Sequence, residues 1–226
     1  MTTRLRFLTW SADRKIFASL SARLIDDKYR EDEGRGFVIE SARPNELSGY
    51  FLQRVVYSDE VLTEDGQLVS TDRIGLLKTR FWATPEPSGL ILMDPPRKVS
   101  EFLMRISQHS KHSLSISPSL INLKQAKKLL ERSFGRSDIR SVRLSNVRID
   151  AEASADVVVT DKTDALRKAD EVFSAFPRLL SKLDMSFPSS SNGLRILVTQ
   201  AGTANIQRAS EQQKIEAISS LRQAIA

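Results

Sequence analysis

The chain has no cysteine and only two histidines in 226 residues. The absence of cysteine excludes disulfides, thiolate nucleophiles and zinc sites built on sulfur, and it removes any need for an oxidising compartment. No window approaches the roughly 18 uninterrupted apolar residues of a membrane helix, and the start MTTRLRFLTW lacks the apolar core of a secretory signal. We therefore expect a cytoplasmic protein that has no membrane partner.

Motifs for nucleotide and serine chemistry are also missing. The GRG stretch at residues 34–36 lacks the rest of a dinucleotide-binding G-x-G-x-x-G, and no G-K-[ST] is present. No G-x-S-x-G exposes a serine nucleophile. We expect no cofactor, and we expect that the protein has no catalytic activity of its own.

The composition is that of an ordinary globular protein, with 40% hydrophobic and 27% charged residues. Strand signals dominate residues 37–93, where four apolar or alternating runs are separated by turn sequences. Helical spacing is found at Asp13–Ile25 and in several segments after residue 96. We predict an α+β fold of mostly antiparallel sheets with packed amphipathic helices, divided into a β-rich half (residues 1–96) and an α/β half with a basic surface (residues 97–226).

The later elements are predicted from capping and breaking residues. The sequence Asp94-Pro95-Pro96 is expected to open a helix, since proline suits the first helical turn. The other predictions are a helix from about Leu120 to Phe134, a strand at Ile139–Asp150 with a bulge near Ser145-Asn146, a helix capped by Thr163 or Asp161 and ended by Pro177, a loop at Pro188–Gly193, a strand at Leu194–Gln200 and a helix from Thr203 onward.

The charges are unevenly distributed along the chain, whose net charge is +6. Residues 26–72 hold five basic and twelve acidic residues, whereas residues 97–148 hold twelve basic and three acidic ones. The acidic stretch is interpreted as the rim of a sheet, as a mimic of DNA or as a docking segment for a basic partner. Pairing of this stretch with the basic one in a dimer would account for both.

The basic stretch is the strongest functional signal. A one-sided basic surface repels itself unless a polyanion neutralises it, so we predict binding to nucleic acid. Duplex DNA is favoured over single strands, because the two phenylalanines of this stretch lie on apolar stripes and are not free for base stacking. Lys124, Lys128 and Arg132 share one helix face and are the main candidates for phosphate contacts. The supporting candidates are Lys127, Arg105, Lys111, Arg136, Arg140 and Arg143.

The two histidines, His109 and His112, lie in the serine-rich stretch RISQHSKHSLSISPSL at residues 105–120. Three interpretations remain open: a metal site, an exposed helix end, or donors to phosphate oxygens. A metal site needs three or four ligands, and a lysine between the histidines would repel the ion. The nearest carboxylates along the sequence are Asp94 and Glu101.

Two other functions remain as alternatives. The charged stretches could meet complementary surfaces in a protein complex or homo-oligomer, which would make this chain an interaction subunit. The stretch ADVVVTDK could instead place Asp156, Asp161 and Lys162 as a metal-dependent nuclease site, although the position two before the lysine is Thr160 and not an acid. Capping of the following helix is the simpler role for Asp161.

The order of elements from residue 50 to about 160 resembles two protein families of bacterial phage defence. The elements are strands FLQRVVYSDEVL and GLLKTRFW, a GLILMD strand with a following helix, a serine-proline segment SISPS, a basic helix and a V-x-L-x-x-V-x-I strand. This layout resembles the phage-exclusion protein A of the lambdoid Rex pair and the B subunit of the Kiwa anti-phage system. The resemblance implies a DNA-binding component of anti-phage defence that acts with a partner.

Overall fold

The computed structural model describes residues 2–62, 65–190 and 192–225, and it forms two compact units. One unit is Trp10–Ile116, and the other combines Met1–Thr9 with Ser117–Ala226. Helices and mostly antiparallel strands alternate irregularly along the chain, so the predicted α+β class is confirmed. None of the described helices is long and apolar enough to cross a membrane.

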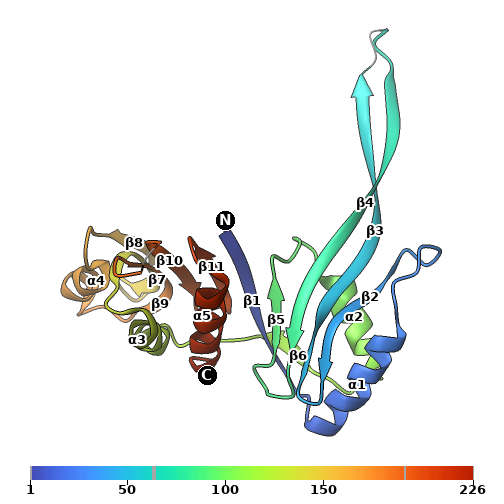
Figure 1. The fold of residues 1–226 in the computed structure, drawn as a ribbon. Helices are drawn as coiled ribbons and strands as arrows, with labels where there is room; N and C mark the ends of the chain where they lie inside the picture. Colours follow the sequence, from blue (N-terminus) through green and yellow to red (C-terminus); the bar gives the residue numbers. More distant parts are fainter. Residues whose placement is uncertain (1, 63–64, 191, 226) are drawn as a thin grey trace. The chain divides into compact units, whose positions relative to one another are not determined.

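The unit Trp10–Ile116 is an antiparallel sheet with two helices, α1 and α2, on one face (Figure 1). The strands follow the order β2-β3-β4-β5. Its elements are α1 (Arg14–Asp26), β2 (Arg35–Arg43), β3 (Glu46–Leu62), β4 (Leu68–Ala83), β5 (Leu90–Met93) and α2 (Ser100–His109). The predicted helix at Asp13–Ile25 and the four strands predicted between residues 37 and 93 are confirmed.

A cluster of aromatic rings forms the core of this unit. The rings of Phe37, Phe51, Phe81 and Phe102 lie with centroids 5.0 to 6.3 Å apart, and all four side chains are buried. The first three come from strands and Phe102 comes from α2. Phe102 is therefore the aromatic contribution of α2 to this core, beside the buried side chain of Ile106.

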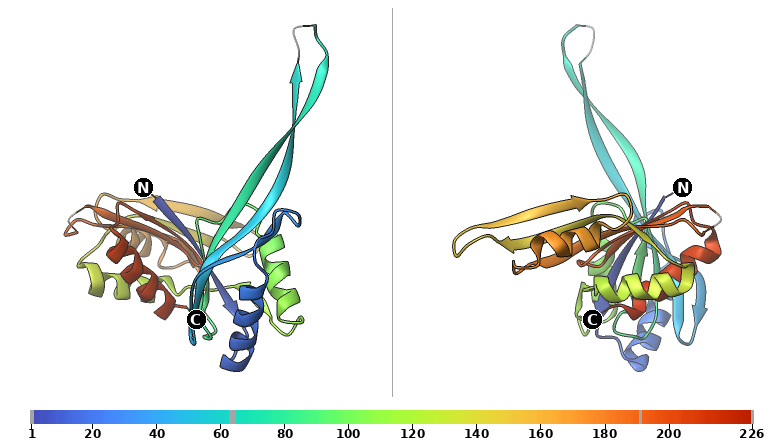
Figure 2. Two further views of the ribbon diagram at one scale, coloured as in Figure 1. Left: turned by 45° about the vertical axis from the view of Figure 1, so that its right-hand side comes forward. Right: turned by 90° about the vertical axis from the view of Figure 1, so that its left-hand side faces the viewer.

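The second unit is an antiparallel sheet in the order β1-β11-β10-β9-β7-β8 (Figure 2). Every second residue of its central strands is buried, as in Leu183, Met185 and Phe187, so one face of the sheet is apolar. Its elements are β1 (Thr2–Trp10), α3 (Leu123–Phe134), β7 (Asp138–Arg148), β8 (Ser154–Thr160), α4 (Ala165–Phe173), β9 (Leu179–Phe187), β10 (Leu194–Thr199), β11 (Thr203–Gln207) and α5 (Glu211–Gln223), while the short β6 (Ile116–Pro118) begins at the end of the other unit.

Several predicted boundaries of the later elements are wrong. The proline pair lies before α2, which begins only at Ser100 because Val99 is its N-cap. The helix expected from Thr203 is instead β11, and the following helix starts after Ser210, which forms a capping box with Gln213. The strand β9 was not predicted at all.

Other details of this unit follow the prediction more closely. The bulge in β7 is confirmed, since its register with β8 shifts between Leu144 and Val147. The helix α3 ends at Gly135 as predicted, but it begins three residues later than Leu120. The helix α4 ends at Phe173, before the expected stop at Pro177. The predicted loop at residues 188–193 lies partly outside the described residues.

The buried ring on α2 gives a direct test of the core. We expect Phe102→Ala to destabilise the protein by about 3–5 kcal/mol, because a buried phenylalanine is lost and a cavity remains. Met104 lies on the same helix and is 44% exposed, so Met104→Ala should change stability by only about 0.5 kcal/mol or less. Urea denaturation of the two variants measures the difference, and equal effects would contradict this description of the core.

Candidate functional site

The predicted basic residues are divided between the two units. Arg105 and Lys111 belong to the unit Trp10–Ile116, whereas the other candidates belong to the second unit. Those in the second unit are Lys124, Lys127, Lys128, Arg132, Arg136, Arg140 and Arg143. The cations are therefore considered unit by unit.

Four of these cations have a carboxylate partner within the protein. Arg105 contacts Asp27, and Arg143 contacts Asp156 at 2.8 Å. The other two pairs are Lys127 with Glu131 at 2.8 Å and Arg140 with Asp138 at 3.8 Å. Their charge is partly neutralised before any ligand binds.

Four basic residues on and beside α3 are exposed and form no ion pair within the described part of the chain. They are Lys124, Lys128, Arg132 and Arg136, and we call them the α3 stripe. The first three recur every four residues and span about 12 Å along the helix axis. Arg136 follows directly after the helix C-cap. The stripe presents positive charge to solvent along one side of the helix.

The sequence around α3 holds this stripe in place. Asn122 caps the first turn by accepting a hydrogen bond from the backbone N–H of Gln125. The opposite side of the helix buries Leu123, Ala126 and Leu130. Gly135 then ends the helix at a φ of 84°, a backbone conformation that favours glycine. Because the apolar side of the helix is buried, the side chains of the α3 stripe lie on the side that is exposed to solvent.

A polar pocket of about 800 Å³ adjoins the end of α3. Its charged side chains have both signs, and Glu131 accepts hydrogen bonds from Lys127 and from the backbone and hydroxyl of Ser137. Burial alone would raise the pKa of Glu131, but these hydrogen bonds outweigh it and hold the pKa below its usual value. The lining residues are Lys127, Glu131, Arg136, Ser137, Asp138, Ile139, Thr163, Asp164 and Arg167. With acids balancing bases, the pocket itself gives no strong preference for anions.

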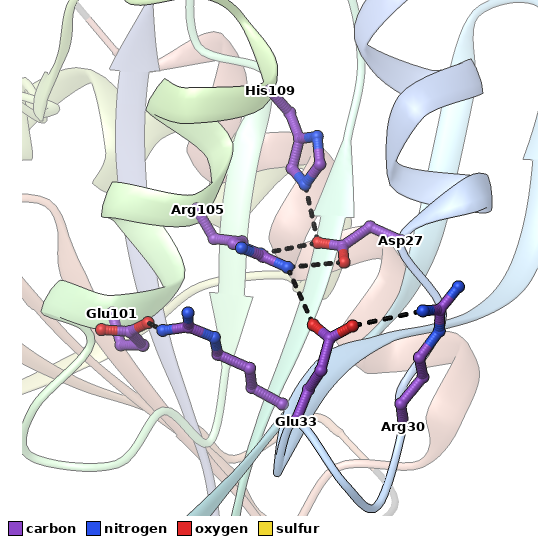
Figure 3. Close-up of polar contacts among 7 residues, drawn as sticks. Asp27, Arg30, Glu33, Glu101, Arg105 and His109 are labelled. Atoms are coloured by element: carbon purple, nitrogen blue, oxygen red, sulfur yellow. Dashed lines mark hydrogen bonds and ion pairs between the residues drawn. The ribbon is translucent and has the colours of Figure 1, made fainter.

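Asp27 is the centre of a second polar site, between the end of α1 and the helix α2 (Figure 3). Its carboxylate accepts two hydrogen bonds of 2.8 Å from the guanidinium of Arg105, through Nε and Nη2. His109 lies one helical turn further along α2, with its Nε2 at 2.6 Å from Oδ2 of Asp27. The Arg105 and Asp27 side chains are only 18% and 11% exposed, so this pair is largely withdrawn from water.

Further charges surround the Asp27 site. Glu33 lies 3.6 Å from Arg105 and 3.3 Å from Arg30, and Arg35 pairs with Glu101 at 2.7 Å. Burial on its own would raise the pKa of Asp27, but the hydrogen bonds from Arg105 and His109 and the charge of Arg105 lower it below its usual value. The carboxylate of Asp27 therefore stays ionised and joins the two helices.

These contacts decide between the interpretations of the histidines. His109 is only 22% exposed and packs edge-on against the ring of Phe37, with centroids 6.4 Å apart. The interpretation of both histidines as an exposed helix end is therefore wrong for His109, whose carboxylate neighbour is Asp27 and neither of the acids nearby in sequence. His112 is exposed and contacts the hydroxyl of Ser107 at 3.0 Å. Within residues 2–62, 65–190 and 192–225, no group of three or more potential metal-binding side chains is present.

The acids of the predicted nuclease site are occupied by local contacts. Asp156 accepts a hydrogen bond of 2.8 Å from Arg143, which lowers the pKa of this carboxyl, as does a bond from the backbone of Asn146. Asp161 accepts hydrogen bonds from the backbone N–H groups of Thr163 and Asp164, and these lower its pKa. The N-cap of α4 is Asp164, not Thr163 or Asp161, so that prediction is wrong.

The long strands β3 and β4 were predicted, but the sequence did not reveal that the far part of their hairpin reaches beyond the ends of β2 and β5. These strands pair from Leu47↔Ala83 to Leu62↔Leu68, while β2 pairs with β3 only as far as Gln53 and β5 pairs with β4 only from Arg80 onward. The far part of the hairpin extends beyond the sheet of its own unit (Figure 1). Two of the predicted strands are much longer than their neighbours, and this difference in length is the signal in the sequence for the extended hairpin.

The chain matches no protein-family model and no curated protein. Any function must therefore be argued from the residues and the geometry described above.

From the contacts of the Asp27 site, we expect a contribution to the free energy of unfolding that depends on pH. We expect Asp27→Asn to lower the free energy of unfolding by about 2 kcal/mol at pH 7, because Arg105 loses its charged acceptor. Since the pKa of Asp27 is lower in the folded protein than the value of about 3.9 in an unfolded chain, its contribution is present above that value and is lost as the pH falls through the folded pKa.

Denaturation series from pH 7 to about pH 2 measure this effect. The difference between the wild type and Asp27→Asn should shrink below pH 4 or so. A matched control is Asp156→Asn, which removes an exposed ion pair and should cost far less at pH 7. A difference that stays constant down to the lowest pH would show that the Asp27 charge does not stabilise the fold.

Proposed function

We propose that the protein binds nucleic acid, with duplex DNA favoured, through phosphate contacts from the α3 stripe. The observation that supports this is that its four cations are exposed and lack carboxylate partners in the described part of the chain, unlike Arg105, Lys127 and Arg143. Lysine and arginine contacts to phosphate fix position and do not read bases. The proposed binding is therefore independent of sequence.

The surroundings of α3 favour double strands. Single-strand binding relies on exposed aromatic rings that stack on bases. The aromatic ring at the end of α3, Phe134, packs on buried Phe187 with centroids 5.6 Å apart. It offers no free stacking platform, whereas a row of cations suits the regularly spaced phosphates of a duplex.

Binding of this kind has a measurable salt dependence. We expect the triple variant Lys124→Gln/Lys128→Gln/Arg132→Gln to reduce the slope of log affinity against log salt by about 3, since each phosphate contact on a duplex contributes about 0.9. Mobility shifts or fluorescence anisotropy with random-sequence DNA at several salt concentrations measure the slope.

The matched control for this experiment lies on the same helix. Lys127→Gln removes a cation that is paired with Glu131, so the slope should change little. An unchanged slope in the triple variant would remove the α3 stripe from the proposal. Lys111 on the other unit is exposed and is a secondary candidate, as is Arg140, which also donates to the backbone carbonyl of Lys162.

The proposal includes a cytoplasmic, non-catalytic role. The resemblance in element order to phage-exclusion and Kiwa proteins supports a place in anti-phage defence together with a partner. The nuclease alternative is tested by incubating supercoiled plasmid with the protein and magnesium or manganese. We expect the plasmid to remain uncut. Cleavage that disappears in Asp156→Asn would support the nuclease instead.

The second candidate function is that of a protein-interaction subunit. It is favoured by the exposed part of the β3–β4 hairpin, whose side chains include several large hydrophobic residues in contact with water. This surface lies on the other unit from the α3 stripe and is independent of it in sequence.

A further inference from the structure

The far part of the β3–β4 hairpin is a two-stranded ribbon, here called the arm, made of residues 55–62 and 68–75. Within the described chain, the outer edges of these two segments pair with no other strand. An isolated two-stranded ribbon is marginally stable in water, and open strand edges invite pairing with other chains. A ribbon of this length is therefore expected to be stabilised by a contact with a partner.

One face of the arm is apolar at both of its ends and polar between them, where the hydroxyl of Ser58 donates a hydrogen bond of 2.6 Å to Asp72. Cross-strand partners share a face, so Val56 lies beside Ile74, and Leu62 lies beside Leu68. These four side chains are 59%, 62%, 66% and 67% exposed. Leu76, paired with Arg54 at the base of the arm, lies on the same face and is also exposed. Such a group of exposed apolar residues is typical of an interaction surface.

The opposite face exposes fewer large apolar side chains, of which Tyr57 is 48% and Val69 is 45% exposed. Asp59 and Arg73 form an ion pair of 3.1 Å across the strands. The ring of Tyr57 lies over Gly75, where an added Cβ would come within 2.7 Å of the ring. The two faces differ, so a partner of the arm would cover the face of Val56 and Ile74.

The charges of the arm are polarised along its length. The base of the apolar face carries Arg54 and Lys78, the latter 3.4 Å from the centre of the Tyr50 ring. The same face carries Asp72 and Glu60 further along the arm, and Asp65 follows in the turn. Arg54 and Glu60 are six residues apart on one strand, or about 20 Å. The arm is therefore basic at its base and acidic near its tip.

We propose that a second copy of this chain covers the apolar face, with the two arms packed face to face and antiparallel about a twofold axis. Antiparallel packing puts the acidic end of each arm on the basic base of the other. The register that sets Arg54 of each copy opposite Glu60 of the other centres the contact between the Val56–Ile74 pair and the Ser58–Asp72 pair. A twofold contact of this kind closes on itself, so the assembly stops at a dimer.

The charge distribution argues against other occupants. The acidic tip repels phosphates, so nucleic acid is a poor partner for the arm. Parallel packing of two arms would set acid against acid and base against base. Only the antiparallel arrangement uses the apolar residues and both charged ends together.

The arrangement can be tested by exchanging charges. Arg54→Glu and Glu60→Arg each place like charges opposite one another at both ends of the contact, and each should weaken self-association by about tenfold. An equimolar mixture of the two variants restores opposite charges at both ends, so heterodimers should form. The double variant Arg54→Glu/Glu60→Arg should dimerise like the wild type.

Sedimentation velocity over a range of concentrations measures these equilibria, and circular dichroism checks that each variant is folded. The matched control is Thr71→Arg, which adds a charge to the opposite face of the arm and should leave the dimer intact. Ile74→Glu should weaken dimerisation in every background.

Three outcomes would overturn the proposal: a wild type that is monomeric at all concentrations, dimers that persist in both single variants, or a mixture that fails to associate. Dimerisation lost both in Glu60→Arg and in the α3 triple variant, but kept in Arg54→Glu, would indicate instead that the acidic tip docks on the α3 stripe. The arm variants leave the α3 stripe unchanged, so failure here and failure of DNA binding are separate results.

Discussion

The ion pair between Arg105 and Asp27 shows the physical constraint that separates the basic residues of this protein into paired and unpaired ones. A cation that is largely withdrawn from water needs an anion beside it, and Asp27 meets both nitrogens of the guanidinium at 2.8 Å. His109 also contacts Asp27 and packs against the ring of Phe37, so the polar site is joined to the aromatic core of the same unit. Arg105 is committed to this structural role and is a poor candidate for binding phosphate.

The same constraint identifies the cations that are available. The Lys127, Arg143 and Arg140 side chains each lie within 4 Å of a carboxylate, whereas Lys128 and Arg132 face only solvent. Within this basic stretch of net charge +9, the α3 stripe is a short row on one side of a helix, and the exposed residues Arg97, Lys98 and Lys111 belong to the other unit. A smaller surface makes fewer phosphate contacts, so the salt dependence of binding should be moderate.

The regular elements were predictable where local signals agree. Alternating residues and turn sequences predicted β2 to β5, helical spacing predicted α1, and Gly135 predicted the end of α3. Prediction failed where elements are short or interrupted by charge. In β9, every second residue from Leu183 is buried, but the charged residue Asp184, which pairs with Arg195 of β10, interrupts the apolar pattern. The strand β11 is only five residues long.

The contacts of the Asp27 site could not be predicted from one sequence, because Asp27 and Arg105 are 78 positions apart and only the packing of α2 brings them together. The arm was visible only as two long alternating runs. Alternation predicts a strand with one face covered, but it does not reveal what covers that face. In the arm, the large apolar side chains of that face are exposed, and β2 no longer pairs with β3 beyond Gln53.

The acidic and basic stretches of the sequence therefore pair with each other only in part. Two acids of the acidic stretch, Asp27 and Glu33, form ion pairs with Arg105. Two others, Glu60 and Asp65, lie towards the far end of the arm and have no cation beside them among the described ion pairs. Isolated acids at the end of an apolar ribbon weaken indiscriminate aggregation while leaving room for one complementary partner. In the proposed dimer, this charge polarity favours the antiparallel arrangement of the two arms, whereas the proposed nucleic-acid contacts belong to the other unit.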